Sequence, residues 1–278
     1  MRALRKRHEK DFSGAGFKGG AFPPEGHSVR LNYHTEKHVE AVPVYSMKFE
    51  IFVGFDSREN AAYEVCVKSL RNHCAKAPKI TPLVEAHLRG LGLYSRRHER
   101  REGRLWDVIS DAPMSTEFAI TRFLTPILSA SPWAVFCDCD FLWRADINDL
   151  LALADPQYAV QIVQHEYAPP EGTKMDGQLQ LNYRRKNWSS LVLWNCNHPA
   201  HEPLIDWINT KPGRNLHAFE WLEDALIGSL PAAWNWLEGH SDASIDPKAV
   251  HFTRGTPEME GYRDIPYAQE WQRVLAGG

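Results

Sequence analysis

The 278-residue chain lacks two features that mark whole classes of protein. No apolar run approaches the roughly 20 residues that a membrane-spanning helix requires. Its five cysteines are odd in number and scattered along the chain, so they do not form a disulfide framework. The simplest setting for such a sequence is a reducing cytoplasm, with peripheral contact at the inner face of a membrane left open.

An excess of charge of either sign is also missing. With 32 basic and 35 acidic residues the formal net charge is −3, which argues against a nucleic-acid partner because phosphate binding normally requires a basic excess. Residues 1–10 are basic, but glycines and Phe22-Pro23-Pro24 follow them in place of an apolar segment, so we expect no signal peptide. At this length the chain can bury a substantial core without disulfides or a structural metal.

The first 46 residues differ from the rest of the chain. They carry Gly-rich and Pro-containing stretches without sustained periodicity, so we expect a flexible or disordered tail over residues 1–46. Regular structure is expected from Met47 onward, as a single domain over residues 47–278. Two explanations of the tail stay open, namely a genuine disordered arm and a gene-model extension upstream of a true start at Met47.

Strand and helix signals alternate after Met47, which is typical of the α/β class. The opening strand, residues 48–55, ends at Asp56, which with Glu59 three residues later predicts the N-cap of an amphipathic helix reaching Cys74. A strand, a sharp turn and a helix in this order open a nucleotide-binding βα unit. Further strands are expected at residues 79–84, 133–139, 158–165, 189–194 and 250–253, and further helices at 113–130, 147–154, 203–209 and 219–230.

Less regular patterns separate these elements. Residues 94–104 carry a run of arginines, which predicts a solvated loop; the functional alternative is a loop that faces phosphate or acceptor. Residues 169–185 are polar and predict a mobile loop, and the C-terminus after residue 253 is expected to be irregular. Pro126 is expected to kink or end the helix over residues 113–130.

Two acidic residues close the strand over residues 133–139. Alternation along a strand places Asp138 and Asp140 on one face and the neighbouring cysteines on the other. Two carboxylates on one face repel each other unless a cation lies between them, and hard oxygen ligands suit Mg²⁺ or Mn²⁺. A lone Asp-x-Asp is a weak signal, because Asp is common where a strand gives way to a loop. Cys137 and Cys139 lack two further ligands at zinc spacing, so we interpret them as small core residues.

The order of segments from Met47 onward resembles glycosyltransferase family 8 and its bacterial relatives, over most of the chain. The family's opening strand with its acidic turn matches residues 51–56, with Asn60 and Tyr63, and its Tyr-Ala-Arg-Leu helix matches residues 118–124. Its apolar strand, Asp-x-Asp and acidic-Leu turn match residues 133–140 and 146–150. Its Asn-x-Gly-x-x-Leu-x-Asn strand is similar to residues 187–195. Its Asp-Gln helix is similar to residues 221–224, and the Leu-Pro-x-x-Trp-Asn strand that follows is similar to residues 230–235. Its C-terminal His-x-x-Gly motif is similar to residues 251–255. Each motif is modest alone, but six in the family's order are specific.

This resemblance implies a GT-A fold with a Rossmann-like mixed central sheet flanked by helices. It also implies retaining transfer of a hexose from a nucleotide-sugar, expected to be a UDP-sugar, to a glycan, a lipid-linked molecule or another small acceptor. Asp138, Asp140 and His251 would hold Mn²⁺ or Mg²⁺, and the ion would neutralise charge developing on the leaving diphosphate. The implied donor-binding residues are Asp56, Asn60, Arg122, Arg254 and Asp138, and the implied catalytic residues near the sugar are Asp224 and Asn187.

The sequence departs from the family's pattern near the diphosphate and the sugar. The lysine that follows the family's His-x-x-Gly is absent, and Arg254 is the candidate replacement. Asp224 is followed by Ala225 in place of Gln. Two alternative functions are therefore compatible with the sequence to different degrees. A sugar-nucleotide nucleotidyltransferase would open with a Gly-rich phosphate loop that residues 55–58 lack, whereas a catalytically degenerate nucleotide-sugar-binding protein of the same fold is compatible with the missing lysine.

Each candidate residue also has an ordinary structural explanation. His251 lies on a short apolar strand, where a hydrogen-bonded core histidine is common. Arg122 could form a structural salt bridge with Glu117 or another acid. Asp56 could be a helix N-cap alone, and Asp224 one more charge on an acidic helix.

Overall fold

A computed structural model describes residues 49–74, 79–166, 172–173, 179–180, 185 and 187–277. The chain divides into two units, Met1–Ala41 and Val42–Gly278, and every described residue belongs to the second unit. The predicted tail over residues 1–46 lies outside the described residues, as does most of the predicted loop over residues 169–185.

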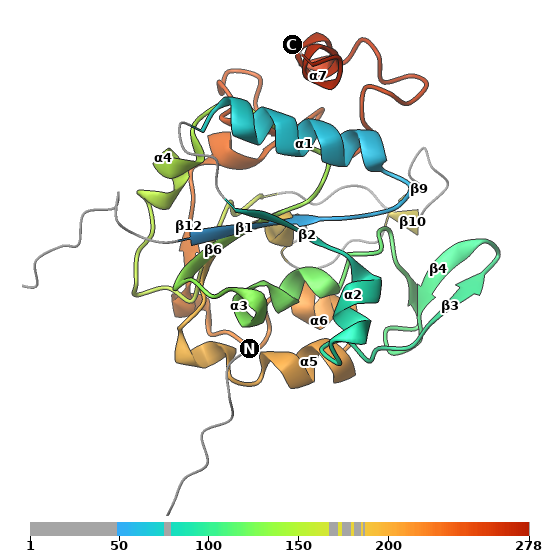
Figure 1. Cartoon of the computed structure of the whole chain (residues 1–278), viewed down its shortest axis with the longest axis vertical. Coiled ribbons are helices and arrows are strands. Elements are labelled where there is room, and N and C mark those ends of the chain that lie inside the picture. The colour runs from blue at the N-terminus through green and yellow to red at the C-terminus, as the bar shows by residue number, and fades with distance from the viewer. Residues whose placement is uncertain are drawn as a thin grey trace, which may run out of the picture. The chain divides into compact units, whose positions relative to one another are not determined.

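A six-stranded mixed sheet forms the centre of the second unit (Figure 1). Its strand order is β12-β8-β11-β6-β1-β2, and β11 runs antiparallel to both of its neighbours while the other pairs are parallel. The strand β6 is buried along its whole length, which fits its continuous apolar sequence. The strands of this sheet are β1 (Phe49–Gly54), β2 (Ile80–Leu83), β6 (Trp133–Cys137), β8 (Val160–Ile162), β11 (Leu191–Asn195) and β12 (Ile227–Ser229).

Helices cover both faces of this sheet (Figure 1). The helix α1 covers one face because residues three and four apart form an apolar stripe that includes Ala62, Cys66 and Leu70. The helix α7 packs against α1, and Trp271 of α7 is buried there. None of the described helices is long and apolar enough to cross a membrane. The helices are α1 (Asn60–Asn72), α2 (Glu85–Gly90), α3 (Thr125–Leu128), α4 (Ile147–Leu151), α5 (Leu204–Thr210), α6 (Gly213–His217) and α7 (Ala268–Leu275).

Smaller strand groups and short 3-10 helices complete the described structure. A second sheet has the order β13-β14-β7, and a third, β3-β4-β5, forms a hairpin that projects from the unit (Figure 1). Their bounds are β3 (His98–Arg101), β4 (Arg104–Asp107), β5 (Ala112–Pro113), β7 (Phe141–Trp143), β9 (Gly172–Thr173), β10 (Leu179–Gln180), β13 (Trp236–Leu237) and β14 (Ala249–His251). The 3-10 helices are η2 (Thr121–Leu124), η3 (Trp188–Ser190), η4 (Pro199–His201), η5 (Asp224–Leu226) and η6 (Ala232–Asn235).

Several predicted elements were wrong in type or extent. The helix expected over residues 113–130 is replaced by β5, η2 and the four-residue α3, because Pro126 has no amide hydrogen to extend α3 backwards. The helix expected over residues 219–230 is replaced by η5 and β12, since Phe219, two residues after the end of α6, adopts a left-handed conformation (φ 52°). The C-terminus is not irregular but contains α7.

Candidate active site

The chain leaves the main sheet after Cys137 and enters the second sheet at Phe141. The predicted strand over residues 133–139 therefore ends two residues early, and Asp138 and Asp140 lie in the connection. The expected alternation still holds in this connection: the side chain of Cys139 is fully buried, while those of Asp138 and Asp140 remain 16% and 21% exposed. Both carboxylates thus stand at the carboxyl end of β6, the edge where ligands bind in α/β sheets.

Strand pairing brings His251 to the same place. The strand β14 runs antiparallel to β7 with His251 opposite Phe141, and the amide of Phe252 donates a hydrogen bond to the carbonyl of Asp140 at 3.1 Å. The His251 ring stacks on Phe141 with 4.6 Å between ring centroids. Asp138, Asp140 and His251 each offer one potential ligand atom, and these three atoms lie within 4.8 Å of one another.

Arg122 approaches this group from η2. Its Nη1 lies 2.7 Å from Asp138 Oδ1 and donates a hydrogen bond to the carbonyl of Ser189 at 3.1 Å. Burial raises the pKa of Asp138 to about 6; repulsion from Asp140 adds to this shift, while Arg122 and His251 oppose it. The alternative pairing of Arg122 with Glu117 does not occur, because Glu117 accepts hydrogen bonds from Ser57.

A cavity of about 360 Å³ opens at this group of residues. Most of the residues proposed from the sequence line it together, namely Arg122, Asp138, Asp140, Asn187, His251 and Arg254. Asn187 adopts a left-handed backbone conformation (φ 64°), which Asn tolerates better than most residues. Lining residues that the sequence interpretation missed include Glu59, Asp107, Ser189, Arg214 and His217.

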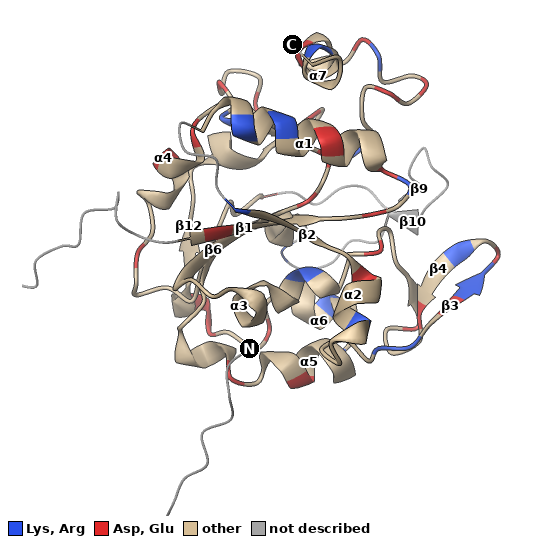
Figure 2. Ribbon diagram, in the orientation of Figure 1, with Lys and Arg blue, Asp and Glu red and all other residues tan. Residues whose placement is uncertain are grey.

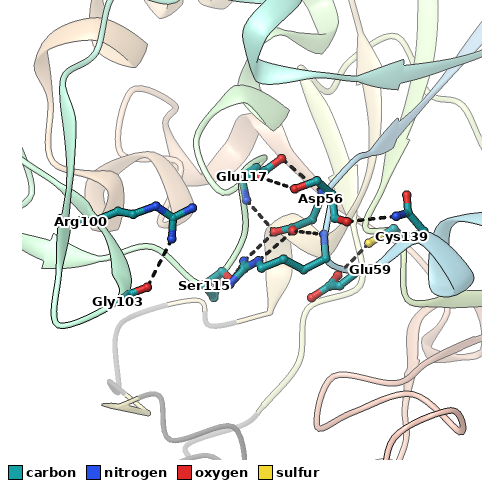
Figure 3. A network of polar contacts seen from close by, with 10 residues as sticks. Asp56, Glu59, Arg100, Gly103, Ser115, Glu117 and Cys139 are labelled. Carbon is teal, nitrogen blue, oxygen red and sulfur yellow. Dashed lines mark hydrogen bonds and ion pairs between the residues drawn. The ribbon is translucent and has the colours of Figure 1, made fainter.

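Glu59 is the most perturbed of the missed acids. Burial raises its pKa to about 7 and the charge of Asp140 adds to the shift, while a hydrogen bond from Cys139 Sγ to Glu59 Oε2 (3.0 Å) opposes it. Figure 3 shows Glu59 and Cys139 facing each other next to Asp56. The sequence indicated only a helix-capping role for Glu59, because its approach to Asp140 depends on the tertiary fold.

Asp56 and Asn60 are not among the described residues that line the cavity. The Asp56 carboxylate is fully buried and accepts hydrogen bonds from the amide and Nε of Arg58, both at 2.9 Å, and from the amide of Glu117 at 3.0 Å (Figure 3). Burial alone would raise the pKa of Asp56, but these bonds outweigh it and lower the pKa. The predicted N-cap at Asp56 was wrong, since α1 begins at Asn60 with Glu59 at its N-cap. Asn60 donates to the carbonyl of Ser57 at 3.0 Å.

Asp224 lies in η5, outside the group of cavity residues described above. It precedes β12, which runs parallel to β8, and β8 and β6 share the antiparallel neighbour β11. The direction of β12 alone does not place the Asp224 side chain, because its partner Arg185 precedes β11, whose first residue pairs with the last residue of β6. The Asp224 side chain is 75% exposed and forms an ion pair with Arg185, and it is not among the described residues that line the cavity.

Arg254 lines the cavity but is held by another carboxylate. Its Nη2 lies 2.7 Å from both carboxylate oxygens of Glu238, a buried residue, and its Nε lies 3.0 Å from Oε2. Gly239 adopts a φ of +73°, and a Cβ at this position would lie 2.3 Å from the Arg254 guanidinium carbon. The backbone thus leaves room for the arginine, whose charge Glu238 already balances.

The arginine run over residues 94–104 contains one buried arginine. Arg96 is 1% exposed and donates from Nε to Asp107 Oδ1 at 2.7 Å and from Nη1 to the carbonyls of Ile208 and Lys211 at 2.9 and 2.6 Å. The prediction of a solvated loop was wrong for Arg96. The other arginines of the run are exposed, and those on β3 and β4 form the basic part of the projecting hairpin (Figure 2).

This arrangement of sheet and helices is similar to solved glycosyltransferases of the GT-A fold. Over 82% of the chain it matches the glycosyltransferase GlyE of Streptococcus pneumoniae (TM-score 0.53, 13% identity) and the galactosyltransferase LgtC, solved with donor and acceptor sugar analogs (TM-score 0.51, 12% identity). The chain spans 60% of the GlyE chain and 95% of the LgtC chain. At such low identity the likeness shows the fold, and it confirms the expected GT-A architecture.

A relative in sequence narrows the class further. The chain is 47% identical over 230 residues to protein CDI of Arabidopsis thaliana, an alignment that covers 80% of this chain and 84% of CDI. The chain therefore belongs to the family of protein CDI. No protein-family model matches it.

Proposed function

We propose that the protein is a metal-dependent glycosyltransferase that moves a hexose from a nucleotide-sugar, with UDP as the expected nucleotide, to a glycan, a lipid-linked molecule or another small acceptor. One observation carries this proposal: Asp138, Asp140 and His251 converge within 4.8 Å beside a cavity of about 360 Å³. The shared fold with GlyE and LgtC and the family 8 motifs support it. We also propose that the reaction retains the anomeric configuration, and only the family 8 motifs support this part of the proposal.

The three converging side chains fit a divalent ion by their chemistry. Two carboxylates and one imidazole nitrogen are ligands that Mn²⁺ accepts, and Mg²⁺ accepts the carboxylates. Asp138, Asp140 and His251 are the residues that would hold the ion. A bound ion would supply Lewis-acid stabilisation of the charge that develops on the leaving diphosphate.

The surrounding residues prepare the cavity for this chemistry. Arg122 fixes the Asp138 carboxylate through a 2.7 Å ion pair that is almost fully buried, which orients the acid without covering both of its oxygens. Glu59, whose pKa is raised to about 7, holds a proton on part of the molecules near neutral pH and so limits the negative charge beside Asp140. The cavity walls formed by Phe118 and Ile120 exclude water from one side.

A second candidate function follows from Arg254. The family's diphosphate-binding lysine is absent, and the replacement Arg254 is already paired with Glu238. A chain that binds nucleotide-sugar without turnover would tolerate this loss. We place this function second because the acidic pair and His251 are retained and converge.

UDP release from a panel of UDP-sugars, with and without Mn²⁺, separates the two functions. Transferase activity predicts Mn²⁺-dependent release that Asp140→Asn lowers by about 10²- to 10³-fold. Binding of a UDP-sugar with no release under any condition would support the degenerate protein instead. Asp149→Asn is a matched control, because Asp149 is a 62% exposed residue on α4.

A further inference from the structure

Asn235 lies beneath the candidate metal ligands at the end of η6. It is completely buried, and its two side-chain atoms contact residues from different segments of the chain. Its Nδ2 lies 2.9 Å from Ser190 Oγ, and its Oδ1 lies 3.1 Å from His251 Nδ1. A buried amide with a partner on each side has a defined orientation, so the identity of these partners matters.

The Ser190 hydroxyl determines which way the Asn235 amide points. Ser190 Oγ donates its single hydrogen to the carbonyl of Asn187 at 2.8 Å, so toward Asn235 it acts as an acceptor. The Asn235 NH₂ group must therefore face Ser190, and its carbonyl oxygen must face His251. An amide oxygen only accepts, which requires His251 to carry a hydrogen on Nδ1.

This hydrogen has a consequence for the other ring nitrogen. In a neutral imidazole with hydrogen on Nδ1, Nε2 carries a bare lone pair. His251 Nε2 lies 3.3 Å from Asp140 Oδ1, so a lone pair and a carboxylate oxygen face each other. A cation or an added proton between these two atoms turns this repulsion into attraction, whereas the opposite tautomer would place two acceptors together at Asn235.

We propose that Asn235 is a positioning residue that holds His251 in the Nδ1–H tautomer and so presents Nε2 as a metal ligand. The inference rests on the proposed function for the identity of the ligand, a divalent cation. Asn235 also connects the segments that form the cavity, because Ser190 accepts a backbone hydrogen bond from the amide of Asp138 at 2.9 Å. Hydrogen-bonded partners of a metal-binding histidine fix its tautomer and orientation, and their loss typically weakens metal binding by about 10- to 100-fold.

The experiment compares Asn235→Ala with Asn235→Asp in the full chain. Alanine removes the acceptor, whereas aspartate keeps an oxygen opposite His251 Nδ1 and takes the Ser190 hydroxyl hydrogen from Asn187 on its second oxygen. We expect Mn²⁺ affinity, measured by electron paramagnetic resonance of free Mn²⁺, to fall about 10- to 100-fold in Asn235→Ala and to stay within a few-fold in Asn235→Asp. Asn195→Ala is the matched control, since Asn195 pairs with Trp133 at the other end of β6 and is expected to leave affinity unchanged.

A second readout observes the tautomer without any metal. Long-range ¹H–¹⁵N spectra of protein labelled at its 13 histidines distinguish Nδ1–H from Nε2–H rings, and a His251→Gln variant assigns the signal. We expect Nδ1–H in the metal-free wild type and in Asn235→Asp, and a mixture or Nε2–H in Asn235→Ala. Thermal unfolding of each variant shows whether the chain is folded.

The two readouts separate the inference from the proposed function. An Nε2–H ring in the wild type, or Mn²⁺ affinity that Asn235→Ala leaves within twofold of the wild type, would overturn the role of Asn235. An equal loss of affinity in Asn235→Asp and Asn235→Ala would do the same. Failure of the wild type to bind Mn²⁺, with the Nδ1–H ring in place, would instead reject the metal dependence of the proposed function and leave the positioning role standing.

Discussion

Two arginine–aspartate pairs each contribute their aspartate to the lining of the same cavity, and they differ in how completely the carboxylate is hydrogen-bonded. Arg96 contacts Asp107 through two nitrogens, and the amide of Ser110 donates to Asp107 at 2.7 Å. Arg122 contacts Asp138 through one nitrogen, and a second carboxylate, Asp140, lies nearby. Burial alone would raise the pKa of both acids.

The pKa values of the two acids consequently move in opposite directions. Hydrogen bonds from Arg96 and Ser110 outweigh the burial of Asp107 and lower its pKa. Arg122 and His251 do not outweigh the burial of Asp138, whose pKa rises to about 6. Breaking a buried, hydrogen-bonded ion pair destabilises the fold because one charge is left unpaired, whereas an acid left short of positive charge is characteristic of a functional site.

The largest effect is expected from removing the charge of Asp140, the carboxylate next to the incompletely balanced Arg122–Asp138 pair. Asp140→Asn should lower turnover of the donor by about 10²- to 10³-fold, because a preorganised electrostatic group is lost, while the melting temperature stays the same or rises. Rates of UDP release and thermal unfolding measure the two properties. A variant that loses its fold together with its activity would contradict the contrast between the pairs.

A large loss of stability is expected from breaking the satisfied pair. Arg96→Met leaves Asp107 buried without its partner, which should cost about 3–5 kcal/mol of unfolding free energy. Arg97→Met is the control, because Arg97 is 77% exposed and its loss should cost under about 0.5 kcal/mol. Denaturant unfolding at pH 7 gives both values. Equal costs for the two variants would show that the Arg96–Asp107 pair contributes little.

The pH dependence of stability tests this comparison further, because folding shifts the pKa values of Asp138 and Asp107 in opposite directions. The folded-state pKa of Asp138 lies above the unfolded value, so its ionised form destabilises the metal-free protein above about pH 6, and stability is regained as the pH falls toward 4. In EDTA, Asp138→Asn should therefore be more stable than the wild type at pH 8, by at most about 3 kcal/mol, with the difference vanishing near pH 4.

Asp107 should show the reverse behaviour. Its folded-state pKa lies below the unfolded value, so its contribution to stability is present above about pH 4 and is lost as the pH falls through the folded pKa. Asp107→Asn should then be less stable than the wild type throughout pH 5–8. Denaturant unfolding across this range measures both variants, and parallel pH profiles for the two would refute the assignment of opposite signs.

The smallest effect is expected at Asp224. Its ion pair with Arg185 is exposed on the aspartate side, and exposed pairs contribute about 0–1 kcal/mol. Asp224→Asn should change Mn²⁺ affinity by less than twofold and stability by less than about 1 kcal/mol. A loss of turnover as large as that of Asp140→Asn would instead support the predicted role of Asp224 in the site.

Sequence alone predicted the elements and residues that depend on local pattern. The apolar run of β6 followed by Asp-x-Asp located Asp138 and Asp140, and the order of motifs added His251 and Arg122. The amphipathic spacing of Ala268, Trp271 and Leu275 was also present in the sequence, so α7 was predictable but was missed.

The remaining features depend on contacts between distant segments. In the sequence Arg96 cannot be distinguished from the exposed arginines beside it. It is buried because it donates hydrogen bonds to Asp107, Ile208 and Lys211. Asn235 stood inside a motif used for the resemblance, but its role depends on the pairing of β14 with β7, which no local pattern specifies. Asp224 was predicted in the site from motif order, but it is not among the described residues that line the cavity, and its ion pair with Arg185 is a contact that no local pattern specifies.

Residues 138–140 connect two different sheets, and this position affects how the site can open by local unfolding. Asp138 follows a strand of the central sheet, whereas His251 belongs to β14 of the three-stranded sheet. Local opening that frees β14 from β7 would separate the imidazole from the two carboxylates without unfolding the central sheet. The convergence of the three side chains therefore depends on the stability of this small sheet. An ion held by all three would join two parts of the unit that could otherwise open independently.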